Sequence, residues 1–167
     1  MEPTPSQTVG PFFSFGLCDR PAAELVREDE PGAVRIAGRV LDGAGEPVSD
    51  ALVEIWQADA EGRYREGWGF GRCGTDADGR YEFLTVKPGR VDDQAPHVNV
   101  LVFARGLLRQ VATRMYFPDE AEANAADPVL STVDPHARDT LVARSDNMDL
   151  RFDIRLQGDG ETVFFAL

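Results

Sequence analysis

The sequence takes on a regular pattern at the stretch Val34-Arg35-Ile36-Ala37-Gly38-Arg39-Val40-Leu41, where most of the larger apolar residues stand at alternating positions. Alternation with a period of two is typical of a β-strand that has one face buried and one face in water. The cluster Asp42-Gly43-Ala44-Gly45 follows directly and consists of residues that favour turns. The stretch therefore predicts a strand that ends in a tight turn.

Further short apolar segments follow along the chain, with turn-forming residues between them. They are residues 51–57, 79–86, 98–104, 150–157 and 162–165. Only residues 118–126 and 135–141 have a helical pattern, and both segments are short. Many short strands separated by turns predict an all-β fold, an antiparallel β-sandwich with one or two short helices.

The first 33 residues do not follow this pattern. Residues 4–17 combine turn formers with three phenylalanines and have neither the helical nor the strand period. An arm this apolar is expected to lie across its own domain or in the groove of a partner. Residues 20–32 are rich in proline and acidic residues and predict an exposed connection. We therefore divide the chain into an irregular N-terminal arm, residues 1–33, and a β-sandwich domain, residues 34–167.

The composition excludes several classes of function. The chain has 167 residues, enough for one domain, and its 29 acidic and 17 basic side chains give a net charge of -12. Such a charge repels phosphate, which argues against binding to nucleic acid or to anionic membranes. No apolar run of about 20 residues is present, and the N-terminus lacks the features of a signal peptide, so a cytoplasmic protein is expected. Cys18 and Cys73 predict buried or half-buried thiols rather than a disulfide framework.

Two patterns resemble known sites only weakly. Asp76-Ala77-Asp78-Gly79 opens like a calcium loop, but Arg80 and Lys87 stand where further ligands are needed. A hairpin turn is the better prediction for this segment. The two histidines, His97 and His136, are not accompanied by a Gly-x-Ser-x-Gly motif, which argues against hydrolase chemistry.

His97 and Asn99 are more informative, because residues two apart on a strand share a face. One imidazole and one amide make a poor site for a transition metal. An amide on an otherwise apolar strand costs free energy unless it is hydrogen-bonded. The two side chains predict either the remnant of a site or a structural polar pair.

Over nearly its whole length the sequence resembles the intradiol ring-cleavage dioxygenases. The most specific motifs are Thr-Pro-Ser-Gln-Thr at residues 4–8 and Trp-Gln-Ala-Asp at residues 56–59. The resemblance extends through residues 9–12, 38–40, 51–55, 79–83, 86–89, 95–99, 103–106, 114–117 and 151–158. It implies a prealbumin-like β-sandwich whose catalytic members bind Fe(III) through two tyrosines and two histidines.

The chain departs from this ligand pattern. His97-Val98-Asn99 stands where catalytic members have His-x-His, and Arg90-Val91 follows Lys-Pro-Gly where they carry a tyrosine. The loop that supplies their other tyrosine is shortened here to residues 65–72. The resemblance therefore implies that this chain has no metal ligands and no catalytic residues of its own. Fe(III) is expected in a homologous catalytic beta subunit.

The resemblance also implies a reaction and a shared site. The beta subunit would use O2 to cleave protocatechuate to 3-carboxy-cis,cis-muconate, a step of aromatic catabolism in the β-ketoadipate pathway. The arm would pack on that partner, and Thr8, Gly10, Pro11 and Arg105 would bind substrate at the interface. A guanidinium at Arg105 can pair with the carboxylate of protocatechuate. The alternative role for Arg105 is a surface ion pair.

Two other functions remain open from the sequence. The chain can be a stand-alone, prealbumin-like binding or structural module whose arm folds back on its own domain. It can also form a homo-oligomer with a site of its own that uses His97 and Tyr116.

Overall fold

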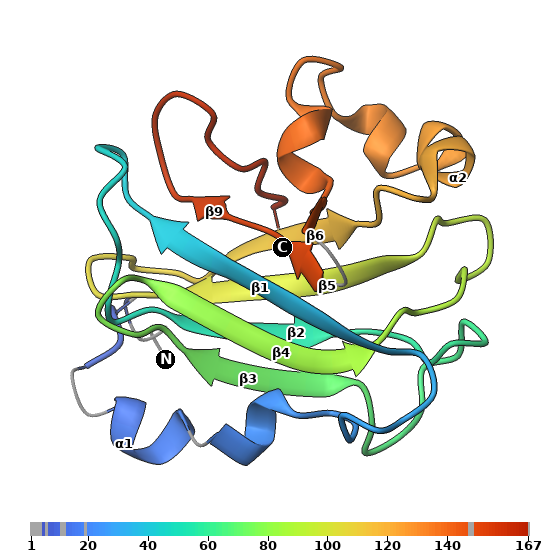
Figure 1. The fold of residues 1–167 in the computed structure, drawn as a ribbon. Helices are drawn as coiled ribbons and strands as arrows, with labels where there is room; N and C mark the ends of the chain where they lie inside the picture. Colours follow the sequence, from blue (N-terminus) through green and yellow to red (C-terminus); the bar gives the residue numbers. More distant parts are fainter. Residues whose placement is uncertain (1–4, 6, 11–12, 19, 147–148, 167) are drawn as a thin grey trace.

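The computed structural model describes residues 5, 7–10, 13–18, 20–146 and 149–166, which form two β-sheets packed face to face (Figure 1). One sheet has the order β4-β1-β8-β7, with β9 also paired to β1. Its strands are β1 Ala33–Leu41, β4 Arg80–Val86, β7 Arg144–Asp146, β8 Asp149–Arg151 and β9 Ile154–Arg155. The other sheet has the order β3-β2-β5-β6. Its strands are β2 Leu52–Trp56, β3 Phe70–Gly74, β5 His97–Phe103 and β6 Val111–Tyr116.

The helical segments are short and lie outside the sheets (Figure 1). They are α1 Phe13–Leu17, α2 Ala121–Ala126 and three 3-10 turns, η1 Arg20–Ala23, η2 Leu130–Thr132 and η3 Arg138–Leu141. α2 and η3 fall within the two segments predicted to be helical, whereas α1 was not predicted. α2, η2 and η3 cover one end of the sandwich and enclose a small apolar cluster that includes Leu130 and Leu141.

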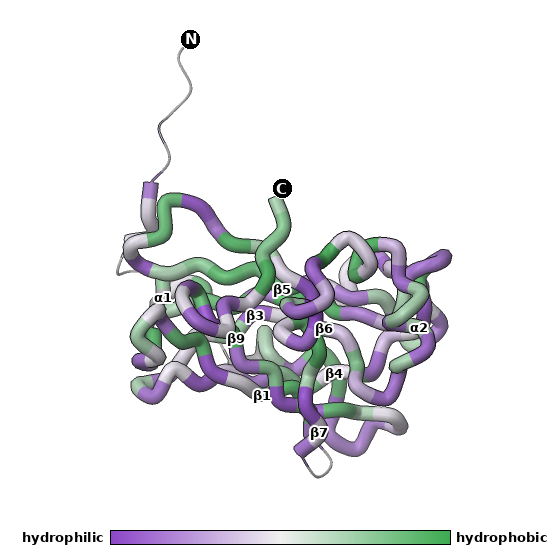
Figure 2. Tube along the Cα trace, turned by 90° about the horizontal axis from the view of Figure 1, so that it is seen from above, coloured by the Kyte–Doolittle hydropathy of each residue, from purple (hydrophilic) through white to green (hydrophobic). Residues whose placement is uncertain are grey.

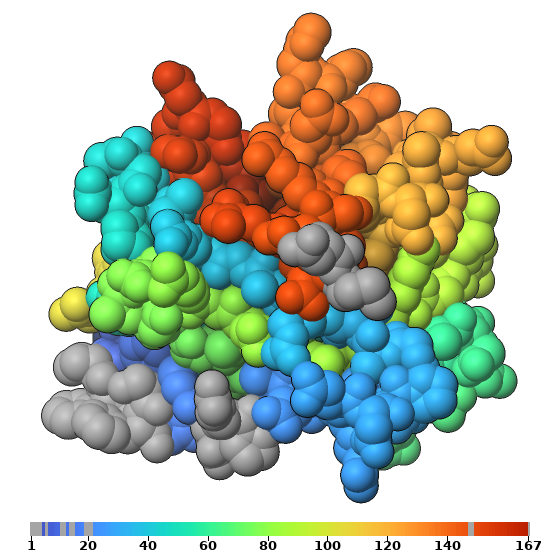
Figure 3. Space-filling model, in the orientation of Figure 1, coloured from blue at the N-terminus to red at the C-terminus, as the bar shows by residue number. Residues whose placement is uncertain are grey.

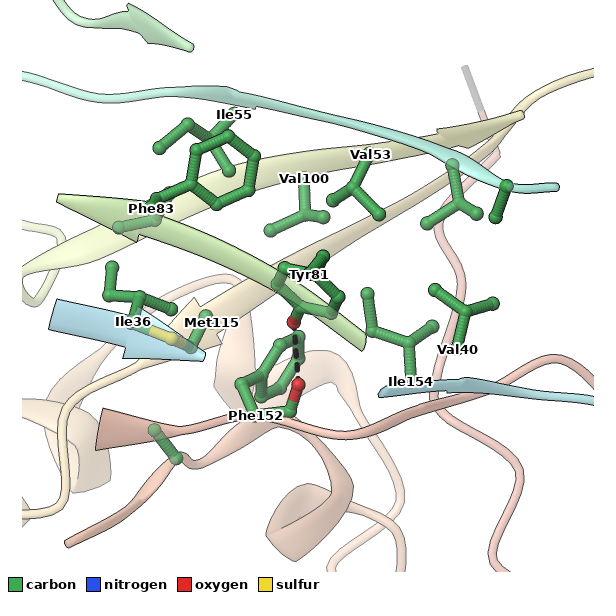
Figure 4. Close-up of a cluster of buried hydrophobic side chains, with 14 of the residues drawn as sticks. Ile36, Val40, Val53, Ile55, Tyr81, Phe83, Val100, Met115, Phe152 and Ile154 are labelled. Carbon is green, nitrogen blue, oxygen red and sulfur yellow. Dashed lines mark hydrogen bonds between the residues drawn. The ribbon is translucent and has the colours of Figure 1, made fainter. Parts of the chain in front are cut away.

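The main core lies between the two sheets, and alternation along the strands fills it. Ile36, Tyr81 and Phe83 project from one sheet and meet Val53 and Val100 of the other (Figure 4). Burial along β1 and β4 alternates between inward and outward residues, as the sequence indicated. The prediction of an all-β sandwich is therefore confirmed.

The sheet that contains β1 is mixed rather than fully antiparallel. β1 runs antiparallel to β4 but parallel to β8 and β9. The predicted strand at residues 150–157 is broken between β8 and β9, because Phe152 turns its ring into the core. At the break, a carboxylate oxygen of Asp153 accepts the backbone N–H of Arg39 at 3.0 Å, so the amide of β1 is still satisfied.

Two local predictions were wrong. Residues 76–79 form a turn, but the strands it joins, β3 and β4, belong to different sheets, so it is not a hairpin. Asp76 stabilises this turn by accepting the backbone N–H groups of Asp78 and Arg80. Residues 162–165 form no strand and make only an isolated bridge between Phe165 and Ala112.

The N-terminal segment lies along one edge of the sandwich (blue in Figure 3). Ala23 is buried, and the backbone N–H of Leu25 donates to the carbonyl of Leu84 at 2.8 Å. The exposed connection predicted for residues 20–32 is therefore confirmed only for residues 27–32, because Ala23 and Leu25 pack on the domain. Hydrophilic β7 lies at another edge of the molecule (Figure 2).

Cys18 and Cys73 are both half-buried thiols, as predicted.

Candidate functional site

The turn that follows β5 presents Arg105 to solvent. The backbone N–H of Leu107 donates to the carbonyl of Ala104 at 3.2 Å, which closes the turn. Gly106 has a φ of +88°, a conformation that glycine adopts without steric cost. The side chain of Arg105 is 63% exposed. The turn thus fixes the backbone and leaves the guanidinium accessible.

The hydroxyl of Thr8, in the arm, is hydrogen-bonded to the backbone on either side of Arg105. It donates to the carbonyl of Ala104 at 3.4 Å and accepts the backbone N–H of Gly106 at 3.0 Å. Two of the predicted substrate-binding residues, Thr8 and Arg105, are therefore adjacent although 97 positions separate them in the sequence.

The other two predicted residues follow Thr8 in the arm. The carbonyl of Gly10 accepts the backbone N–H of Phe13 at 3.3 Å, at the start of α1. Pro11 lies outside the described residues. Of the predicted residues that the structure describes, only Thr8 is hydrogen-bonded to the Arg105 turn.

Asp50 holds the guanidinium of Arg105 from the loop before β2. Its carboxylate forms an ion pair with Nε of Arg105, and the Asp50 side chain is 28% exposed. Both residues line a groove of about 1210 Å³, which also extends past Phe13 of α1 and Arg72 of β3. An arginine on the wall of such a groove is suited to binding a carboxylate.

A second group of polar side chains lies on the outward face of the β3-β2-β5-β6 sheet, where His97 and Asn99 share a face. The amide of Asn99 donates to the backbone carbonyl of Trp56 at 3.2 Å and to the hydroxyl of Tyr64 at 3.0 Å. Arg114 is the register partner of Asn99 on β6 and donates to the side chain of Gln94 at 2.7 Å. Asn99 is therefore a satisfied polar group.

His97 belongs to a buried network at the end of β5. Its Nδ1–H donates to the carbonyl of Ala95 at 2.8 Å, since a carbonyl oxygen can only accept. Its register partner Tyr116 is fully buried and donates to Asp127 at 3.1 Å. Burial raises the pKa of Tyr116 to about 12, so this phenol stays protonated at neutral pH. Asp127 also accepts the backbone N–H of Ala95 at 2.8 Å, and the network ties β5 and β6 to the segment after α2.

The ionisation of His97 is expected to make stability depend on pH. Burial lowers the pKa of His97, and the nearby guanidinium of Arg114 lowers it further. Below about pH 6.5 His97 is protonated in the unfolded chain but stays neutral in the folded chain. The free energy of unfolding should therefore decrease as the pH is lowered below that value. Urea unfolding measures this free energy, which should decrease less between pH 7 and pH 5 for His97→Gln than for the parent chain. His136→Gln, a change at an exposed histidine, is the control, and equal slopes for the His97 variant and the parent would contradict this account.

Comparison with known proteins agrees with this geometry. A family profile described as Dioxygenase matches residues 9–158. The protocatechuate 3,4-dioxygenase alpha chain of Burkholderia cepacia is 45% identical over 193 residues, covering 99% of this chain and 98% of the relative. The beta chain of the same enzyme from that organism is 36% identical and covers 82% of this chain and 70% of the relative. The dioxygenase domain of a carbohydrate-binding fusion protein from Streptomyces sp. SirexAA-E has a similar fold, with a TM-score of 0.65, 30% identity, and coverage of 94% of this chain and 99% of that one.

This chain belongs to the intradiol ring-cleavage dioxygenase family. Members of this family depend on iron in general, so the outward face around His97 can be compared with what a ferric ion needs. It offers one imidazole, an amide whose NH2 group donates to Tyr64, and the cationic side chain of Arg114. A ferric ion prefers anionic oxygen and imidazole donors and is repelled by a guanidinium. The residues present do not fit iron.

The rest of the described structure also offers no group of metal-binding side chains. Within the described ranges, no group of three or more His, Cys, Asp or Glu side chains is placed to hold a metal ion. In the same part of the chain, every helix is too short or too polar to cross a membrane.

Sequence reasoning missed two residues of this intradiol dioxygenase chain. Tyr64 lies just before the loop that was identified as shortened, and its contact with Asn99 depends on how that loop folds back. Asp50 is separated from Arg105 by 55 positions, and nothing in its local sequence indicates an ion pair with that residue. A search for carboxylates at strand entrances would have included Asp50 among many others.

Proposed function

We propose that this chain is the non-iron-binding alpha subunit of a protocatechuate 3,4-dioxygenase. A homologous beta subunit would hold Fe(III), and the complex would convert protocatechuate and O2 to 3-carboxy-cis,cis-muconate, with both oxygen atoms retained in the product. Support comes from the 45% identity to an alpha chain over nearly the full length of both proteins. The 36% identity to a beta chain supports a partner that shares the same fold.

One observation supports the proposal that only the beta subunit binds iron. On the face where two imidazoles would be needed, this chain has His97 and the hydrogen-bonded amide of Asn99, with Arg114 beside them. Iron chemistry would therefore belong to the partner. The residues of this chain would bind and orient the substrate, with Thr8, Gly10, Pro11 and Arg105 facing the shared site and Arg105 pairing with the substrate carboxylate.

The outward face of the β3-β2-β5-β6 sheet is suited to contact with the partner. Trp56 is 57% exposed, Phe70 is 49% exposed and Tyr64 is 44% exposed. Phe70 and Trp56 are register partners on β3 and β2, and the ring of Tyr64 meets that of Trp56 edge-on at 6.0 Å. Exposed aromatic side chains gathered on one face are typical of interfaces. We propose that the beta subunit covers this face. The arm, residues 1–33, would also pack on the beta subunit.

Trp56→Asp is expected to weaken the complex with the beta subunit by roughly tenfold in Kd, because a large aromatic anchor is replaced by a charge that must be desolvated. Titration of labelled beta subunit with the variant would measure the change. Ala77→Asp adds the same charge at an exposed turn and is the control. An unchanged Kd for Trp56→Asp would place the partner elsewhere.

The proposed activity is tested by co-expressing the chain with a homologue that has two tyrosines and a His-x-His motif. The purified pair should consume protocatechuate and O2 in equal amounts, and the product should contain both atoms of labelled oxygen. A pair that assembles without cleaving protocatechuate would overturn the proposed substrate.

A stand-alone module is the second candidate, and the contact between Thr8 and its own domain favours it. Affinity purification from the source cell separates the two functions. A stoichiometric homologue of the kind described above supports the subunit, whereas recovery of this chain alone supports the module.

A further inference from the structure

The ion pair at Arg105 uses only one side of its guanidinium. The carboxylate of Asp50 accepts a hydrogen bond from Nε, and within the described residues the two terminal NH2 groups of Arg105 donate no hydrogen bond. These terminal groups are the pair of donors that matches a carboxylate in a bidentate arrangement. The donor pair that a substrate carboxylate would need is therefore left open.

Without Asp50, the direction of the Arg105 side chain would be set by little else. Thr8 fixes the backbone on both sides of Arg105 but does not contact its guanidinium. A long arginine side chain that is 63% exposed has many accessible rotamers, and ordering it on binding costs free energy. A second group that orders the side chain in advance reduces that cost.

Asp50 is itself held in place by the adjoining backbone. The backbone N–H of Ala51 donates to the hydroxyl of Thr75 at 2.9 Å, and the backbone N–H of Thr75 donates to the carbonyl of Ala51 at 2.9 Å. Ala51 is buried, so the Asp50 carboxylate extends from a fixed point toward Nε of Arg105.

We propose that Asp50 is a positioning residue that orders Arg105, so that its terminal NH2 groups face the carboxylate of an aromatic ortho-diol acid. This inference rests on the proposed function, because it takes Arg105 as the group that binds substrate. Asp50 acts through Arg105 and does not touch the substrate. It therefore contributes to selectivity for diols that carry a carboxylate over diols that lack one.

The test uses the assembled pair with the partner unchanged and compares protocatechuate with catechol, which lacks the carboxylate. Asp50→Asn should raise KM for protocatechuate roughly fivefold, the scale expected for one exposed ion pair, with kcat and the KM for catechol nearly unchanged. Asp50→Glu keeps the charge and should recover part of the loss. Asp78→Asn removes the same kind of ion pair, with Arg80, from the exposed turn at residues 76–79 and should leave both KM values as they are.

A double-variant cycle separates failure of this inference from failure of the proposed function. If Asp50 acts only through Arg105, Asp50→Asn adds no further increase in KM when Arg105 is already alanine. An Asp50→Asn pair with unchanged or lowered KM, beside an Arg105→Ala pair with raised KM, overturns the positioning role alone. An Arg105→Ala pair with unchanged KM overturns the substrate role of Arg105 and the inference with it.

Discussion

Arg105→Ala in the assembled pair should raise KM for protocatechuate by roughly 10- to 100-fold, the effect of losing charge-assisted hydrogen bonds to a carboxylate. Arg105 lies on a turn fixed by Thr8, and it lines a groove of the domain. Iron content should be retained, because Arg105 belongs to the subunit that is proposed to hold none. Steady-state kinetics with protocatechuate and metal analysis of the same preparation measure both quantities.

Arg109→Ala is the matched control for this prediction. Arg109 is another exposed arginine on the connection between β5 and β6, four positions beyond Arg105. Its removal changes the net charge by the same amount and should leave KM within about twofold, as expected for an exposed charge that does not line the groove. Equal increases for the two variants would mean that Arg105 acts only through long-range charge, and the proposed contact with substrate would be wrong.

Gly38→Ala should destabilise the fold by about 3 kcal/mol or more, because a new methyl group cannot be accommodated. A Cβ at Gly38 would lie 1.8 Å from the carbonyl oxygen of Phe152 and 2.9 Å from the hydroxyl of Tyr81. That hydroxyl donates to the same carbonyl at 2.5 Å (Figure 4). The backbone between β8 and β9 would have to move, and the buried hydrogen bond would be strained or lost.

Urea unfolding of the isolated chain measures the loss in stability, and Gly16→Ala is the control. A Cβ at Gly16 in α1 would meet nothing within 4 Å, so that variant should unfold close to the parent. If Gly38→Ala also unfolded with the parent, the close packing of β1 against Phe152 would be disproved.

The strands that sequence reasoning found are those with strong alternation and clear ends. β1 and β4 alternate inward apolar and outward polar residues, and Gly45 and Gly79 lie in the turns beside them with positive φ. β3 was missed because it contains two glycines and lies at the edge of its sheet, where partner strands rather than intrinsic propensity decide the pairing. The break between β8 and β9 depends on the contact between Phe152 and Gly38, which no local pattern indicates.

The site was predictable only in part, for a similar reason. Thr8 and Arg105 came from motifs of the family, and their adjacency depends on the arm crossing the β5–β6 turn. The odd polarity of Asn99 was visible in the sequence, but its partner Tyr64 was not. Asp50 joined the site only when the loop before β2 was placed beside Arg105. Contacts between distant segments are set by the packing of the whole sandwich, and local periodicity carries no information about them.

In the proposed complex, iron belongs to the beta subunit and both subunits bind the substrate. Metal analysis of this chain expressed alone, of the beta subunit, and of the assembled pair would locate the iron. We expect no stoichiometric iron on this chain alone, and iron in the pair in proportion to the beta subunit. Stoichiometric iron on this chain alone, together with ring cleavage by it, would show that this chain is itself the catalytic subunit.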